Sequence, residues 1–230
     1  IQCPDQTGII ARVSDFVFRK GANIIRSDQY STDPLGGRFF MRLEFYFDPG
    51  KLRVETLESD FDTLAGQLDA AWEIHYAHEP MRMGIAVSRQ GHCLSDLLYR
   101  WDSGEIDVEL TCVVSNHDKL RRTVEHYGIP FYHVPRTGDD KAQQERDILD
   151  AIAGKTDFLV LARYMQILSG SFLQRYERNI INIHHSFLPS FKGADPYRQA
   201  YERGVKVIGA TAHFVTENLD EGPIIEQAVE

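Results

Sequence analysis

One segment of the sequence, INIHHSFLPSFKG at residues 181–193, places an amide and two imidazoles where a buried strand is expected to end. Its isoleucines are typical of a buried strand, and the proline and glycine that follow prevent a simple continuation of that strand. Ligands of open α/β sheets bind where strands end. We therefore expect that Asn182 can donate a hydrogen bond to an oxyanion and that His184 can move a proton near neutral pH.

A second segment, GATAHFVTENLDEGPIIEQ at residues 209–227, carries a further imidazole and a carboxylate. A strand that contains His213 leads into a loop that contains Asp220. We expect His213 to be a buried strand residue with a hydrogen-bonding partner. Asp220 follows His184 by 36 residues, so only the folded chain can bring the two side chains together.

The adjacent histidines do not form a pattern typical of a metal site. Successive residues of an extended segment point to opposite sides, so His184 and His185 are poorly placed to chelate one ion. The sequence has no HExxH or CxxC motif, and Ser186 is not part of a GxSxG turn. We expect no metal and no cofactor, and we expect His185 either to pack within its loop or to position a water molecule.

The composition is that of an ordinary globular protein, with 230 residues, 43% of them hydrophobic and 26% charged. A net charge of −9 argues against a nucleic-acid partner bound by phosphate neutralisation. No apolar run has the length of a membrane span and no signal peptide is visible, so we expect a cytoplasmic protein with no membrane partner. The sequence lacks an initial Met and stops at Glu230 within an apolar run, so we expect residues to be missing at both ends.

The elements expected to position these side chains lie in a block at residues 80–230, where strands alternate with helices. This alternation predicts an α/β fold with a doubly wound, mainly parallel sheet. We expect strands at 81–88, 108–115, 129–134, 158–162, 180–183, 205–215 and from 223 onward. We expect helices at 91–101, 118–127, 141–152, 168–176 and 196–203.

The first block, residues 1–79, ends before a helix-breaking proline at position 80. Its pattern predicts a strand at the start, a helix at 9–20, strands at 24–30 and 39–47 around a turn at 33–38, a helix at 56–68 and a short strand at 72–76. This order, βαββαβ, is the ferredoxin-like arrangement.

The start of this block, CPDQTGIIARVSDF followed by GANI, resembles the ACT domain, a family of small regulatory modules. The resemblance implies that Asp5, Thr7, Gly8 and Asn23 bind an amino-acid effector, glycine or methionine, at a subunit interface. The alternative is a purely structural or assembling role, because the same residues make a good turn and helix start without any ligand. Exposed sheet edges in such a block also favour a homo-oligomer.

The two segments of the second block together resemble the formyltransferase family, whose members use 10-formyltetrahydrofolate. The catalytic residues of that family are an Asn, a His two residues later and a distant Asp in an LD-x-G-P loop, which implies that Asn182, His184 and Asp220 are catalytic. VLARYMQIL at residues 160–168 resembles the segment that lines the folate pocket of the family. The substrate-binding residues that this implies are Met165, Gln166, Ile167, Leu168, His185 and Lys192, although Lys192 fits a solvated loop lysine as well as a partner of a folate glutamate tail.

Three features favour the hydrolytic branch of this family over its amine-formylating branch. An ACT-like block precedes the catalytic block, His185 stands where the transferase branch typically has Pro, and SRQGHCLSD at residues 88–96 lacks a glycine- and serine-rich phosphate loop. We therefore expect hydrolysis of 10-formyltetrahydrofolate to formate and tetrahydrofolate, which supplies formate for purine synthesis and balances one-carbon folate pools. The folate and water are then the partners of the enzyme.

Two other functions stay open at this point. One is formyl transfer to a small amine, and the other is a non-enzymatic amino-acid sensor. For the hydrolase we expect Asp220 to act chiefly as the base on water with His184, the division of proton transfers between the two being undecided. The sequence does not identify the group that protonates the departing nitrogen.

Overall fold

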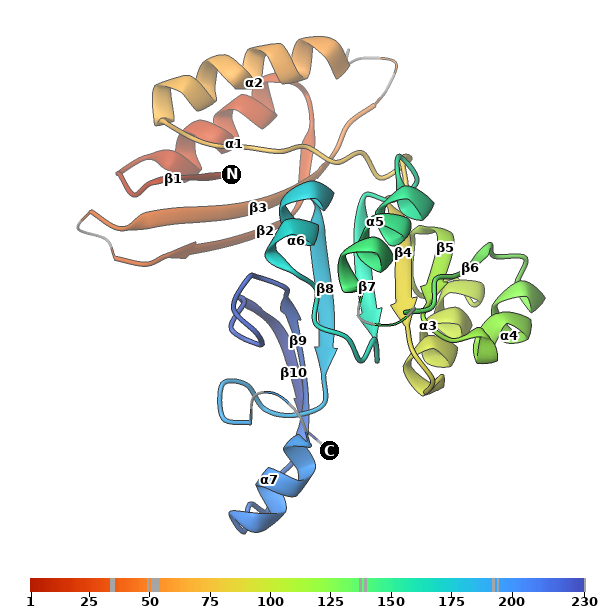
Figure 1. The fold of residues 1–230 in the computed structure, drawn as a ribbon. Helices are drawn as coiled ribbons and strands as arrows, with labels where there is room; N and C mark the ends of the chain where they lie inside the picture. The colour runs from red at the N-terminus through yellow and green to blue at the C-terminus, as the bar shows by residue number, and fades with distance from the viewer. Residues whose placement is uncertain are drawn as a thin grey trace. The chain divides into compact units, whose positions relative to one another are not determined.

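The computed structural model describes residues 1–33, 36–48, 50, 54–136, 138, 140–191, 193 and 195–229. The backbone divides into two compact units, Ile1–Ala77 and His78–Glu230 (Figure 1). Among the described residues, no helix combines the length and the apolar character that crossing a membrane requires.

The second unit is built on a sheet of seven strands within the described residues, in the order β10-β9-β8-β7-β4-β5-β6. The strands β4 to β8 run parallel, whereas β9 and β10 continue the sheet in antiparallel pairs. The strands are β4 (Arg82–Val87), β5 (Glu109–Ser115), β6 (Phe131–His133), β7 (Phe158–Ala162), β8 (Asn179–His184), β9 (Gly209–Phe214) and β10 (Ile224–Val229).

Helices cover both faces of this sheet, so the doubly wound, mainly parallel arrangement predicted from the sequence is confirmed (Figure 1). Leu98 of α3 and Val124 of α4 pack with Ile85 of β4 in one apolar cluster. Ile148 of α5 and Phe172 of α6 pack in the other. The helical elements are α3 (His92–Asp102), the 3₁₀ turn Asp118–Leu120, α4 (Arg121–His126), α5 (Lys141–Ile152), α6 (Gly170–Tyr176) and α7 (Pro196–Glu202).

The direction of strand addition reverses between β4 and β7. The chain runs from β4 outward to β5 and β6, and then returns to place β7 and β8 on the other side of β4. Val87 pairs with Ala162 at the carboxyl ends of these two strands, so Ser88 and Arg163 are the residues that leave the sheet there. Such a switch point is where open α/β sheets bind ligands.

The antiparallel pairing of β9 with β8 brings together the two segments that carry the candidate catalytic side chains, residues 181–193 and 209–227. In the register of β8 with β9, Asn182 lies opposite His213 and His184 lies opposite Thr211. The loop after β9 passes so close to that strand that a side chain at Gly222 has no room, since a Cβ there would lie 1.7 Å from the carbonyl oxygen of Phe214.

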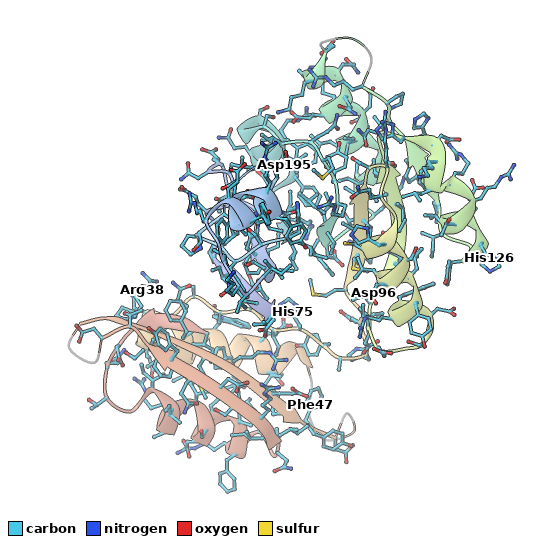
Figure 2. The ribbon with its side chains drawn as sticks, turned by 90° about the horizontal axis from the view of Figure 1, so that it is seen from below. Arg38, Phe47, His75, Asp96, His126 and Asp195 are labelled. Atoms are coloured by element: carbon cyan, nitrogen blue, oxygen red, sulfur yellow. The ribbon has the colours of Figure 1, made fainter. Side chains whose placement is uncertain are left out.

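The first unit contains a three-stranded antiparallel sheet within the described residues, in the order β1-β3-β2, and two helices. Its apolar core joins Ile9 and Val13 of α1 to Met41 of β3 and Leu68 of α2. Figure 2 labels Arg38, the first residue of β3, and Phe47, just beyond the end of that strand. The elements are β1 (Gln2–Pro4), α1 (Ile9–Arg19), β2 (Asn23–Ser31), β3 (Arg38–Tyr46) and α2 (Val54–Leu68).

The predicted short strand at residues 72–76 is wrong. An isolated bridge joins Gln2 to Ala71, but residues 72–76 pair with no described strand. The aromatic side chains of this segment turn toward α2 instead, because Trp72 Nε1 donates to Asp62 Oδ1 at 3.2 Å and the Tyr76 hydroxyl donates to Glu58 Oε1 at 2.7 Å. The described unit is therefore βαββα, and the predicted turn at 33–38 includes residues 34 and 35, which lie outside the described residues.

The tight packing of β4 generates a prediction about stability. A Cβ added at Gly84 would lie 2.7 Å from Thr156 Cγ2 and 3.1 Å from Leu159 Cδ1 in the core. We expect Gly84→Ala to lower the free energy of unfolding by about 1–3 kcal/mol, measured by urea denaturation. The control is Gly66→Ala in α2, where a Cβ meets no atom within 4 Å, and where we expect a gain of roughly 0.5–1 kcal/mol. Equal effects at the two sites would contradict the packing described for β4.

Candidate active site

Asn182 and His213 form a hydrogen-bonded pair across β8 and β9. His213 Nδ1 lies 3.0 Å from the carbonyl oxygen of Phe214, and its Nε2 lies 3.1 Å from Asn182 Nδ2. A carbonyl oxygen can only accept, so Nδ1 carries the proton and Nε2 accepts from the Asn182 amide. His213 is 2% exposed, which confirms the buried strand histidine predicted from the sequence. Its ring fixes the orientation of the Asn182 carboxamide.

Asp220 places its carboxylate between two imidazoles. Its Oδ2 accepts a hydrogen bond from the Gly193 backbone amide at 2.9 Å and lies 3.6 Å from His184 Nδ1. Its Oδ1 lies 3.7 Å from His213 Nε2. The residue is 9% exposed and has a left-handed backbone with φ of 55°. The fold thus brings together Asn182, His184 and Asp220, which the sequence alone could not do.

His184 is positioned to accept a proton on the side that faces Asp220. It is 5% exposed, and its Nε2 lies 2.8 Å from the carbonyl oxygen of Phe191. That carbonyl requires a proton on Nε2, so in the neutral ring the lone pair of Nδ1 faces the Asp220 carboxylate. The separation of 3.6 Å is longer than a hydrogen bond. A proton taken up at Nδ1 would turn this contact into an ion pair.

The hydroxyl of Thr211 holds the loop that follows β8. It is fully buried and donates to the carbonyl oxygen of Ser186 at 2.6 Å. It accepts from the backbone amide of Leu188 at 3.2 Å and from Gln227 Nε2 at 3.0 Å. The loop that carries His185 is therefore fastened to both β9 and β10.

His185 lies beside the buried imidazole of His184 but stays neutral. The two ring centroids are 5.5 Å apart, and the ring of Tyr197 lies 5.3 Å from that of His185 on another side. Burial, followed by the positive charges of Arg163 and His184, lowers the pKa of His185 to about 4, against the opposing charges of Asp195 and Asp220. Above pH 5 this ring is neutral, and its unprotonated nitrogen can accept a hydrogen bond.

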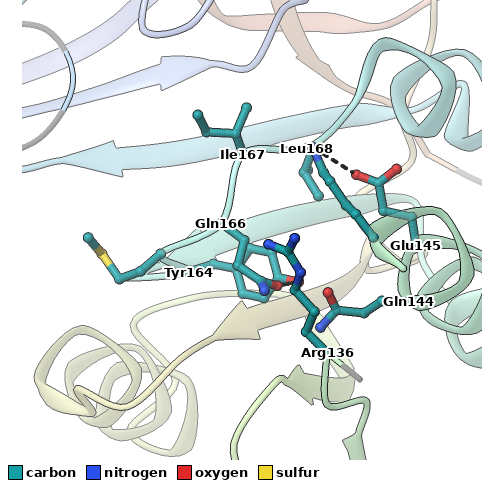
Figure 3. Close-up of a pocket in the computed structure, with 9 residues that line it drawn as sticks. Arg136, Gln144, Glu145, Tyr164, Gln166, Ile167 and Leu168 are labelled. Atoms are coloured by element: carbon teal, nitrogen blue, oxygen red, sulfur yellow. Dashed lines mark hydrogen bonds and ion pairs between the residues drawn. The ribbon is translucent and has the colours of Figure 1, made fainter. Parts of the chain in front are cut away.

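The segment Tyr164–Leu168, which follows β7, lines a cavity of about 330 Å³. Figure 3 shows the polar ends of Arg136, Gln144 and Gln166 gathered on one side of this segment, while Ile167 points away from them. The Tyr164 hydroxyl donates to Gln166 Oε1 at 2.7 Å, and burial raises the pKa of Tyr164. Of the six residues predicted to bind substrate, four lie at this cavity, namely Met165, Gln166, Ile167 and Leu168, whereas His185 is not part of its lining.

Not every predicted site residue joins a cluster. Lys192 lies outside the described residues. Asp5, Thr7 and Gly8 share the loop before α1, where Ser31 Oγ donates to the Asp5 carboxylate. Asn23 stands beyond the other end of α1, an 11-residue helix that spans about 16 Å. Within one chain, the four predicted effector residues are therefore not one site, because the helix separates the fourth from the other three.

Two features of the site were not predicted. No role for Thr211 is expected from the sequence, although its place opposite His184 in β9 is the signal that could have pointed to it. None is expected for Arg163 either, whose backbone is left-handed with φ of 59°. Among the described residues, no group of three or more His, Cys, Asp or Glu side chains is arranged to hold a metal ion.

The chain is similar in sequence and in fold to proteins of known family. Residues 81–229 match the family described as formyl transferase. Formyltetrahydrofolate deformylase of Bacillus subtilis (strain 168) is 48% identical over 231 residues, which cover all of this chain and 77% of that protein. A crystal structure of a formyltetrahydrofolate deformylase from Pseudomonas syringae pv. tomato str. DC3000 is 45% identical with a TM-score of 0.92, covering 100% of this chain and 77% of that one. A phosphoribosylglycinamide formyltransferase from Brucella melitensis is 35% identical with a TM-score of 0.61, covering 66% of this chain and 80% of that one.

The contacts of Thr211 generate a prediction. Thr211→Val keeps the shape of the side chain but removes the buried hydroxyl from its three partners. Because a buried polar group without a partner costs about 1–3 kcal/mol, we expect the free energy of unfolding to fall by about 2–4 kcal/mol in urea denaturation. The matched control is Thr216→Val, since that residue is exposed, and we expect it to cost less than about 1 kcal/mol. Equal losses in the two variants would show that Thr211 does not fasten the loop.

Proposed function

The chain belongs to the formyltetrahydrofolate deformylases of the formyl transferase family, and from this membership we propose that it hydrolyses 10-formyltetrahydrofolate to formate and tetrahydrofolate. The observation that carries the proposal is the buried carboxylate of Asp220, which lies within 3.7 Å of the imidazoles of both His184 and His213. This geometry supports activation of a water molecule, the one acceptor that hydrolysis needs.

In the proposed mechanism each of the three residues has its own chemical role. Asp220 and His184 take a proton from water as its oxygen attacks the formyl carbon. Asn182, whose carboxamide is oriented by His213, donates an N–H to the oxyanion of the tetrahedral intermediate. The carbon–nitrogen bond then breaks, and the proton held by His184 and Asp220 passes to the departing nitrogen. Formate and the amine of tetrahydrofolate are the two products.

The cavity along Tyr164–Leu168 supports the binding of a folate. Its volume of about 330 Å³ lies in the range of small-molecule sites. Exposed apolar side chains of Met165 and Ile167 offer contacts for a flat ring, and Arg136 and Lys141 bring positive charge to the lining. We assign this cavity to the folate and His185 to the side where water enters. Lys192 remains a candidate partner of the glutamate tail from the sequence resemblance alone.

Formyl transfer to an amine is the less favoured function. The relatives that match the entire chain are named deformylases, whereas the phosphoribosylglycinamide formyltransferase covers 66% of it at a TM-score of 0.61. The loop after β4, Ser88–Gly91, carries one glycine before α3, which is a poor cradle for a phosphate. We further propose a cytoplasmic role in which the formate released feeds purine synthesis.

We assign the first unit to regulation and assembly, in keeping with its resemblance to the ACT domain. Its β2 strand forms an edge of the sheet with Ile25 62% and Tyr30 66% exposed, which supports pairing with a second copy. An effector site that uses Asn23 together with Asp5, Thr7 and Gly8 requires such a second copy, because α1 separates these residues within one chain.

The role of Asp220 generates a prediction about activity. We expect Asp220→Asn to lower kcat by at least about 10³-fold, measured as formate release, because the base is lost. The fold should persist, since Asn tolerates a left-handed backbone and its carbonyl can still accept from Gly193. The matched control is Asp69→Asn, which has φ of 52° on the surface of the first unit and should keep full activity. Near-normal turnover of Asp220→Asn would remove Asp220 from the mechanism.

The effector proposal is tested by calorimetry with glycine and with methionine. We expect saturable heat from one of these amino acids, and we expect it to disappear in Asp5→Ala, because the loop before α1 loses its carboxylate. Asp15→Ala is the control, since that side chain pairs with Arg19 on the exposed face of α1. If neither amino acid gives heat, the first unit has an assembling role only.

A further inference from the structure

Arg163 has a backbone conformation that its residue type disfavours. It is the first residue after β7 and has φ of 59°, in the left-handed region where glycine is the usual residue. A residue with a long side chain is strained there. Strain of this kind at a switch point of the sheet indicates that the side chain serves a purpose that glycine would not.

The guanidinium of Arg163 is held by a neutral side chain. Its Nε and Nη2 both donate to the same atom, Gln90 Oε1, at 3.0 and 2.6 Å. No carboxylate among the described residues forms an ion pair with it. The uncharged Gln90 therefore orients the guanidinium but leaves its positive charge and further N–H donors available for an anion.

Arg163 leaves the sheet at the same edge as the residues of the candidate active site. Leu161 of β7 pairs with Asn182 of β8, so Arg163 and His184 each lie two residues beyond that pair, at the carboxyl ends of these neighbouring strands. The charge of Arg163 also reaches His185, where it is the largest influence after burial that keeps the ring neutral. His185 thus lies beside the imidazole of His184, within reach of the charge of Arg163, and adds no charge of its own.

We propose that Arg163, oriented by Gln90, is the binding site for formate, the carboxylate product of the reaction. The proposal rests on the proposed function. In that reaction a carbon–oxygen bond forms to water and the carbon–nitrogen bond breaks, one water proton passes to the nitrogen, and the other is lost from formic acid to solvent. The new carboxylate matches the planar fork of a guanidinium.

The test compares formate binding by the full chain and by Arg163→Gly. Glycine fits the left-handed backbone, so this variant should unfold at the same temperature as the parent chain or higher. Binding of ¹³C-labelled formate is followed by NMR line broadening at constant ionic strength and without folate. We expect Arg163→Gly to raise the Kd for formate by about tenfold or more, as for the loss of a charge-assisted hydrogen bond. Arg163→Lys, which keeps the charge without the fork, should lie in between.

The matched control is Arg89→Ala. Arg89 follows β4 at the same end of the sheet and donates to His117 Nε2 at 3.2 Å. Unchanged formate binding in this variant, with weakened binding in Arg163→Gly, supports the proposal. Equal formate binding by the full chain and Arg163→Gly, or no binding by the full chain, overturns it. Formate release from 10-formyltetrahydrofolate by the full chain separately tests the proposed function, because the binding measurement involves no turnover.

Discussion

The buried carboxylate of Asp220 is the constraint on which the arrangement of the second unit depends. A carboxylate removed from water costs several kcal/mol unless hydrogen bonds and nearby partners compensate. Here the carboxylate accepts a hydrogen bond from the Gly193 amide, and the imidazoles of His184 on β8 and His213 on β9 lie within 3.7 Å of it. These partners meet only because β9 pairs antiparallel with β8 in a register that sets His213 opposite Asn182. The same register then orients the Asn182 amide, so one pairing positions both of the groups to which the proposed mechanism gives the roles of base and oxyanion donor.

A second constraint is the distribution of charge around His185. Asp220 carries a negative charge, Arg163 carries a positive charge, and His185, whose pKa both of them influence, stays neutral above pH 5 because that pKa is about 4. Protonation of His185 would add a second positive charge near Arg163, and the protonated ring of His185 could no longer accept a hydrogen bond. His185 takes up a proton near pH 6.5 in the unfolded chain, but only near pH 4 in the folded chain. The contribution of His185 to stability is therefore complete above about pH 6.5 and decreases as the pH falls toward 4.

Much of the second unit could be predicted from the sequence, because the spacing of apolar residues indicates which side of a helix or strand is buried. The helix Lys141–Ile152 and the strand Phe158–Ala162 have the predicted bounds. The strand predicted at 72–76 fails because alternation does not reveal that Trp72 and Tyr76 hydrogen-bond to α2. Asn182, His184 and Asp220 were identified as candidates by motif, but their convergence is a property of strand register. The left-handed backbone of Arg163 could not be predicted, because the neighbouring residues in the sequence do not indicate it.

The central claim is that this site delivers water to a formyl group. It is tested most directly by turnover of 10-formyltetrahydrofolate in H₂¹⁸O without any amine, followed by mass spectrometry of the formate. The account predicts that each formate released carries one oxygen atom from the solvent. Formate without solvent oxygen, or a formyl group recovered only on an added amine, would contradict it.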